Sequence, residues 1–285
     1  MWIILAIGSA IFAGLASVLA KCGLQDMDST VATAYRTFMV MLFICAVAFI
    51  SGSFAGLDSI SDRSWTFLIL SGFTTGASWL CFFKALQLGN VNKVVPVDKT
   101  SNVLAIFLAI TILGEMLSPI GFVGVALILI GTLMMITKKD IKEVNERNSW
   151  LLFALGSAIF TALTSTLGKI GVEDVDPILG TAIRTVVVVI MTWTMAFALK
   201  KKDQMRNLER KEVLISILFG IVRGVSWICF FSALQIGPAS IIVPIDKLSI
   251  LVAVLFSYLI FKEKLTKKSA IGLAGIVAGT LLLLF

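Results

Sequence analysis

Eight charged side chains inside otherwise apolar stretches are the residues of this sequence best suited to chemistry. They are Arg36, Lys84, Asp98, Lys99, Arg184, Arg223, Asp246 and Lys247. A charge in a membrane-spanning segment costs roughly 3 kcal/mol on insertion scales, so it normally faces a polar interior or a partner. Because most of the set is positive, it favours an anionic or zwitterionic ligand.

Six of these charges form a pattern that occurs twice. Arg36 with the pair Asp98–Lys99 and Arg184 with the pair Asp246–Lys247 occupy equivalent places in the two halves of the chain. One interpretation is a pair of buried salt bridges that orient helices. The other is two alternating gates, in which either aspartate could also couple transport to protons. For Lys84, Lys99 and Lys247, reaching out to the membrane interface is a further alternative.

Aromatic side chains recur on one face of two predicted helices, at spacing i, i+4 and i+8. The residues are Thr75, Trp79 and Phe83, and in the second half Arg223, Trp227 and Phe231. Arg223 is near mid-span, whereas its counterpart Thr75 is neutral. A guanidinium one turn from an indole can bind a carboxylate or phosphate and stack on a ring. The pattern predicts a substrate pocket, which includes Lys84, one residue beyond Phe83. One alternative is that the aromatic side chains only pack between helices. Another is that Arg223 pairs helices through a backbone carbonyl or Asp246.

The composition predicts that membrane-spanning helices position these residues. Of the 285 residues, 58% are hydrophobic and 14% charged, and the mean hydropathy is +1.01. These values exclude a soluble enzyme, a disordered chain and a collagen-like fibre. The chain has no histidine, the commonest general base and metal ligand. We therefore expect no enzyme activity, no metal and no cofactor. Cys22, Cys45, Cys81 and Cys229 lack metal-site spacing and are predicted to be packing residues.

An internal duplication organises the chain. Residues 1–137 align without a gap with residues 149–285, and a charged linker, 138–148, joins the two units. TAYRT at 33–37 recurs as TAIRT, SWLCFFKALQLG at 78–89 as SWICFFSALQIG, and VPVDKTS at 95–101 as VPIDKLS. Pro96 and Pro244, just before the aspartates, predict a helix start or break.

Each unit contains five apolar segments, so two parallel copies enter the membrane in opposite orientations. We therefore expect an all-α integral membrane protein with ten transmembrane helices arranged as a 5+5 inverted repeat. The expected segments are 2–20, 29–51, 65–88, 94–113, 119–137, 150–168, 178–199, 212–235, 242–261 and 267–285.

The basic residues predict the orientation. The connections that follow the first, third, fifth, seventh and ninth spans all lie on one side of the membrane. Outside the spans, all Lys and Arg except Arg63 and Lys169 fall on that side. Cytoplasmic loops carry such an excess, so both termini are expected outside the cytoplasmic membrane. The net charge of +7 belongs to this asymmetry and not to a nucleic-acid surface. Glu115 and Glu263 are expected at the interface.

Together, the repeated [ST]-A-x-R-T, the SW-x-CFF-x-ALQ-x-G helix and the P-x-D-K sequence resemble the EamA family of the drug/metabolite transporter superfamily. The resemblance covers nearly the whole chain and implies a secondary carrier that moves a small metabolite by alternating access. It implies cytoplasmic termini, but the local charges predict the reverse. The expected partners are a small-molecule substrate, the bilayer and either a proton or a counter-substrate, with the protein a monomer or homodimer. A flippase for lipid-linked substrates and a subunit of a membrane complex stay open as alternatives.

Overall fold

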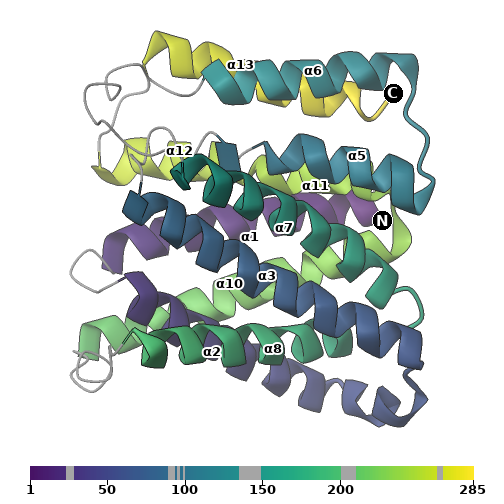
Figure 1. Ribbon diagram of the computed structural model, residues 1–285, viewed down its shortest axis with the longest axis vertical. Helices are drawn as coiled ribbons and strands as arrows, with labels where there is room; N and C mark the ends of the chain where they lie inside the picture. The colour runs from purple at the N-terminus through teal and green to yellow at the C-terminus, as the bar shows by residue number, and fades with distance from the viewer. Residues whose placement is uncertain are drawn as a thin grey trace.

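A computed structural model describes residues 1–23, 29–88, 94, 97–98, 100–134, 149–199, 210–261 and 266–285. Within these ranges every regular element is a helix, and the helices run alongside one another (Figure 1). The first unit contains α1 (Trp2–Gly23), α2 (Ser29–Ile50), a 3-10 helix η1 (Ser53–Ser59), α3 (Asp62–Leu88), α5 (Ser101–Leu113) and α6 (Pro119–Met134). The second contains α7 (Ser149–Gly171), α8 (Pro177–Ala198), α10 (Arg210–Ile236), α11 (Ala239–Lys247), α12 (Ser249–Phe261) and α13 (Lys267–Leu282).

The helix boundaries correct the predicted segments at the fourth position of each unit. The segment expected at 242–261 is two helices, α11 and α12, separated at Leu248. Pro244 therefore lies inside α11 and not at its start, and the break follows four residues later. In the first unit the regular helix α5 begins at Ser101, and Pro96 lies outside the described residues.

Seven described helical segments are long and apolar enough to cross a membrane. α5 and α6 are apolar but shorter. A run of about 20 apolar residues is what a bilayer requires, so these segments identify a chain that crosses the membrane several times.

Helices of one unit pack on helices of the other in equivalent pairs. α3 packs on α7 and α1 on α10, which is the same contact made twice with the units exchanged. α6 and its counterpart α13 form a separate pair at one edge of the bundle (Figure 1). A Cβ built on Gly124 would lie 2.6 Å from the Gly279 carbonyl, and one built on Gly131 2.5 Å from the Gly272 carbonyl. This pairing of ascending with descending residue numbers makes α6 and α13 antiparallel.

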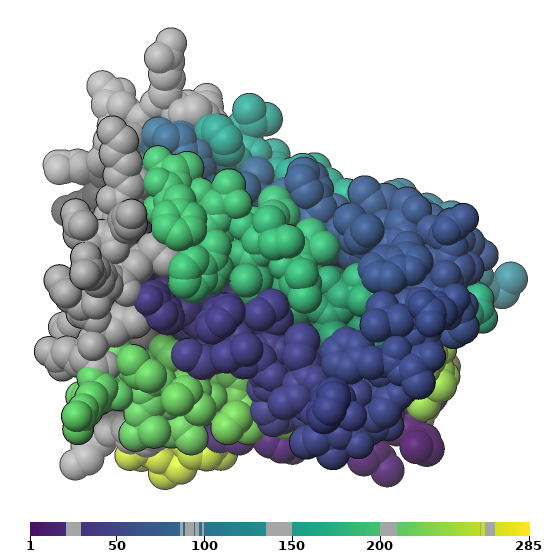
Figure 2. Space-filling model, turned by 90° about the horizontal axis from the view of Figure 1, so that it is seen from below, coloured from purple at the N-terminus to yellow at the C-terminus, as the bar shows by residue number. Residues whose placement is uncertain are grey.

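α2 and α8, also counterparts, lie at the opposite edge of the bundle from α6 and α13 (Figure 1). α2 contacts both α8 and α10, and its surface lies between theirs in Figure 2. Gly220 and Gly224 of α10 admit this contact, because a Cβ on either would collide with Met39 or Phe43 of α2. The helices α2, α3, α8 and α10 carry most of the predicted site residues.

Both chain termini lie at the same end of the bundle (Figure 1). Trp2 contacts Gly237 at the end of α10, and Leu283 packs with Leu117 and Ile241. We call this end, defined by Trp2, Leu117, Gly237 and Leu283, the termini face. The other end, where α3, α6 and α8 finish, is the opposite face.

Candidate functional site

Arg184 of α8 lies at the centre of the site and is 1% exposed. Its Nε donates to Ser71 Oγ at 3.3 Å and its Nη2 to Thr75 Oγ1 at 3.0 Å, both on α3. Each hydroxyl donates its own proton to a backbone carbonyl, so its oxygen is free to accept. Nη1 is buried without a hydrogen-bond partner in the structure. Arg184 thus brings a full positive charge into the core with neutral partners.

Arg223 of α10 approaches the same aromatic surface. The guanidinium carbon of Arg184 lies 5.3 Å from the ring centroid of Trp227, and that of Arg223 lies 5.4 Å from it. Arg184 is also 4.0 Å from the centroid of Phe231. These distances are typical of cation–π interactions. Such an interaction stabilises a desolvated guanidinium by about 2 kcal/mol but does not neutralise its charge. The structure therefore brings together Arg223, Trp227, Phe231 and Thr75, four of the predicted substrate-binding residues.

Duplication gives the two equivalent arginines unequal surroundings. Ser71 and Thr75, which hold Arg184, correspond to Phe219 and Arg223 in the second unit. Arg36, the counterpart of Arg184, lies 5.3 Å from the ring centroid of Phe219, and its buried Nε has no hydrogen-bond partner in the structure. The site is therefore asymmetric where the sequence is duplicated, and Arg223 is the added charge.

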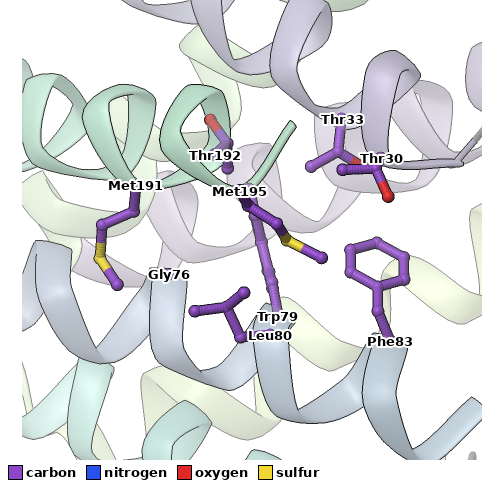
Figure 3. Close-up of a pocket in the computed structure, with 9 residues that line it drawn as sticks. All are labelled: Thr30, Thr33, Gly76, Trp79, Leu80, Phe83, Met191, Thr192 and Met195. Atoms are coloured by element: carbon purple, nitrogen blue, oxygen red, sulfur yellow. The ribbon is translucent and has the colours of Figure 1, made fainter. Parts of the chain in front are cut away.

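Trp79 and Phe83 line a small pocket of their own. They point from α3 toward Met195 of α8 and Thr30 of α2, with Trp79 also packed against the cluster of Trp227 (Figure 3). The cavity has a volume of about 10 Å³, space for roughly one water. Lys84, which is exposed, lines a second cavity of about 430 Å³ near the opposite face, together with Cys81 and Phe153. Lys84 is thus separate from the arginine site.

The two aspartates bond to serines and not to arginines in the described structure. Asp98 accepts from Ser157 Oγ at 2.6 Å, and Asp246 accepts from Ser9 Oγ at 2.5 Å. Each bond joins one unit to the other, and the two are exact repeats of each other in the duplication. The expected ion pairs of Arg36 with Asp98 and of Arg184 with Asp246 are absent among the described residues. Asp246 nonetheless acts electrostatically on Arg223.

Lys99 and Lys247 complete the predicted set of gating residues. Lys99 lies outside the described residues, and Lys247 is half-buried at the end of α11. Among the cysteines, Cys81 packs against Gly156 and Cys229 against Gly8, both as free thiols.

Glu115, which the sequence predicts at the membrane interface, makes three hydrogen bonds at the termini face that the sequence did not predict. Glu115, between α5 and α6, accepts from Lys169 Nζ of α7 at 2.6 Å and from the backbone N–H groups of Ala239 and Ser240 at 2.7 and 2.8 Å. Lys169 also donates to the Gly237 carbonyl at 2.7 Å. The available signal was that Lys169 is one of only two basic residues predicted outside the spans on this side.

The electrostatics of Glu115 favour its charged form. Burial opposes ionisation, but the hydrogen bonds from Lys169 and from the start of α11 outweigh it and hold the pKa of Glu115 below its usual range. Glu115 is therefore a carboxylate at neutral pH, paired with an ammonium and a helix N-terminus.

Comparisons with known proteins agree with this architecture. The profile of the EamA-like transporter family matches residues 1–137 and again 148–285. A curated protein from Sinorhizobium sp., named as an uncharacterized transporter in the cobO 3′ region, is 40% identical over 134 residues, which are 47% of this chain and 95% of that protein. A solved crystal structure, named only as that of a protein, has a TM-score of 0.82 at 14% identity and covers 100% of this chain and 98% of its own, which shows a shared fold.

Proposed function

The chain belongs to the EamA-like transporter family, and we propose that it is a secondary carrier that moves a small anionic or zwitterionic metabolite across the cytoplasmic membrane by alternating access. The substrate site lies between the two units, around Arg184, Arg223 and Trp227. Arg36, Asp98 and Asp246 change partners as the two faces open in turn.

The observation that carries this proposal is the buried, incompletely bonded guanidinium of Arg184. A charge taken out of water requires a counter-charge and hydrogen bonds, and arginine does not release its proton in proteins. Here Arg184 has hydroxyl partners only, Nη1 has none in the structure, and the nearby charge acting on it is the positive one of Arg223. An anionic group on a substrate would supply both the counter-charge and the missing acceptor.

The packing of the two units supports the alternating-access part of the proposal. α6 and α13 are antiparallel counterparts, as expected for ten spans in a 5+5 inverted repeat. The serine–aspartate bonds Ser157–Asp98 and Ser9–Asp246 are an equivalent pair between units. Two equivalent inter-unit contacts allow one to weaken while the other holds, which is what opening one face at a time requires.

The test is ligand binding to Arg223→Thr, a substitution that restores the residue carried by the other unit. The purified protein is screened by thermal unfolding against carboxylates, phosphate esters, amino acids, cations and neutral solutes, because a ligand that binds the folded state raises its apparent stability. We expect an anion or zwitterion to raise Tm of the wild type and the shift to disappear in Arg223→Thr. Flux of that compound into proteoliposomes should disappear with it.

Arg63→Gln is the matched control, because Arg63 is an exposed arginine that faces Glu173 at 3.9 Å. It should bind like the wild type. Stabilisation by a cation, or by an anion equally well in Arg223→Thr, would contradict the assignment. Movement of labelled lipid without flux of any soluble compound would favour a flippase.

A further inference from the structure

Glu115 joins the two units at the termini face by three hydrogen bonds. It belongs to the first unit, whereas its donors Lys169, Ala239 and Ser240 belong to the second. Hydrogen bonds to charged groups are roughly twice as strong as those between neutral groups, so this cluster is a strong point of closure between units. A second ion pair, Arg63–Glu173, is 3.9 Å long with both side chains more than 60% exposed, and it contributes little.

Glu115 also caps the N-terminus of α11, which has no side-chain cap of its own. The cap residue of α11 is Pro238, which makes no side-chain hydrogen bond to the first N–H groups of the helix. Helix N-termini leave such groups unpaired and carry a partial positive charge. The carboxylate of Glu115 satisfies two of them from the other unit. If the units separate here, α11 loses its cap.

α11 connects this cluster to the candidate substrate site. It has nine residues, and Asp246 near its end accepts from Ser9 and acts on Arg223. A nine-residue helix is about 13 Å long, so α11 reaches from the Glu115 cluster at Ala239 to Asp246, with Pro244 inside it. α11 therefore joins the Glu115 cluster to the candidate substrate site.

The ion pair of Glu115 and Lys169 is partly accessible to water, so it can break as well as form. The side chains of Glu115 and Lys169 are 11% and 22% exposed, so water reaches both. Breaking a fully buried ion pair is costly, because each charge is left in the protein interior without a partner. When a pair at the edge of solvent breaks, water replaces the lost partner of each charge.

We infer that Glu115 and Lys169 form the gate of the termini face, and that opening this face requires Glu115 to release both Lys169 and the N-terminus of α11. The inference rests on the proposed transport function and adds a residue pair outside the arginine site.

The test measures access to both faces in a cysteine-free protein reconstituted in nanodiscs. Ala6→Cys reports on the termini face, because Ala6 is fully buried in the cluster that includes Ala239. Ala34→Cys reports on the opposite face, where Ala34 is fully buried against Ala196. We expect Glu115→Gln to raise the rate at which a water-soluble maleimide labels Ala6→Cys by about tenfold. Labelling of Ala34→Cys should stay equal or fall.

Lys169→Met removes the same pair from the other side and should give the same result. Glu173→Gln removes the exposed pair at this face and should leave both rates unchanged. Parallel increases at both reporters would mean unfolding and would overturn the gate, as would no increase at Ala6→Cys in either variant. Because labelling requires no substrate, a gate that opens as expected in a protein that binds no solute would refute the transport proposal and leave the gate standing.

Discussion

At the scale of single residues, equivalent arginines of the two units have different surroundings. Arg184 has two hydroxyls from α3, whereas Arg36, its counterpart, lies over Phe219. The difference arises at two positions, where Ser71 and Thr75 are replaced by Phe219 and Arg223. The two units share a helical frame, and of the two differences on α10 only Arg223 adds a positive charge to the site.

Glu115 predicts a pH dependence at this scale. Its pKa is lowered in the closed state, so its contribution to closure is complete above the ordinary glutamate value of about 4 and is lost as the pH falls through the lower value. Opening exposes the carboxylate and raises its pKa, and acid therefore favours the open termini face. Labelling of Ala6→Cys, divided by the labelling rate of a free thiol at the same pH because maleimide reacts with the thiolate, should increase as the pH is lowered below about 4.

Glu115→Gln is the control for this pH series. Lys169 and the N–H groups of α11 face Glu115 directly, and Glu173 and Asp176 are further carboxylates at the same face. If those carboxylates caused the effect, Glu115→Gln would keep the pH dependence. A flat profile in Glu115→Gln assigns it to Glu115.

At the scale of helices, small residues decide which apolar surfaces meet. In lipid, helices associate by close packing and not by the hydrophobic effect, so glycine at a crossing point lets backbones approach. The seam of α6 and α13 uses Gly124 and Gly131 on one helix and Gly272 and Gly279 on the other.

This seam gives a stability prediction. Gly131→Ala would place a Cβ 2.5 Å from the Gly272 carbonyl and 2.9 Å from the amide nitrogen of Ile276, so the helices must separate. Overpacking of this kind typically costs about 1–3 kcal/mol, and Tm in detergent should fall. Gly275→Ala is the matched control, since its Cβ would lie 3.5 Å from Gly131, an ordinary contact. Equal Tm values for the two variants would show that the seam is not tightly packed in the membrane.

At the scale of the whole molecule, the chain is a multi-pass membrane protein of the EamA-like transporter family. Both termini lie at one end of the bundle (Figure 1). Glu115 and Lys169 lie at the same end, because Lys169 bonds to Glu115 and to the carbonyl of Gly237, which Trp2 contacts. The distribution of Lys and Arg predicts that this end faces outward.

The orientation is tested with one tag at each terminus. In intact cells, we expect an impermeant protease to remove both tags, because both termini are predicted outside. A tag on the connection between α8 and α10 should resist until the membrane is permeabilised, since that connection holds many basic residues. Protection of both terminal tags would reverse the assignment and place the Glu115 gate on the cytoplasmic side.

The sequence alone predicted the family, the helical architecture and the local groupings, because these depend on neighbours along the chain. Apolar runs of about 20 residues mark spans, and spacing by four residues places Arg223 and Trp227 on one face. Pro244 predicted a helix start or break in this region, but the position of the break at Leu248 and the shorter α5 were not predicted, because hydropathy alone does not locate a helix interruption.

Only the tertiary structure determines which distant residues form hydrogen bonds with one another. Arg184 bonds to Ser71 and Thr75 across more than 100 residues, and Glu115 bonds to Ala239 across 124. A membrane helix is apolar around most of its circumference, so its hydrophobic pattern does not say which face meets which neighbour. That choice depends on how small residues and polar groups of distant helices fit together, and it placed Arg184 in the site and Glu115 at the start of α11.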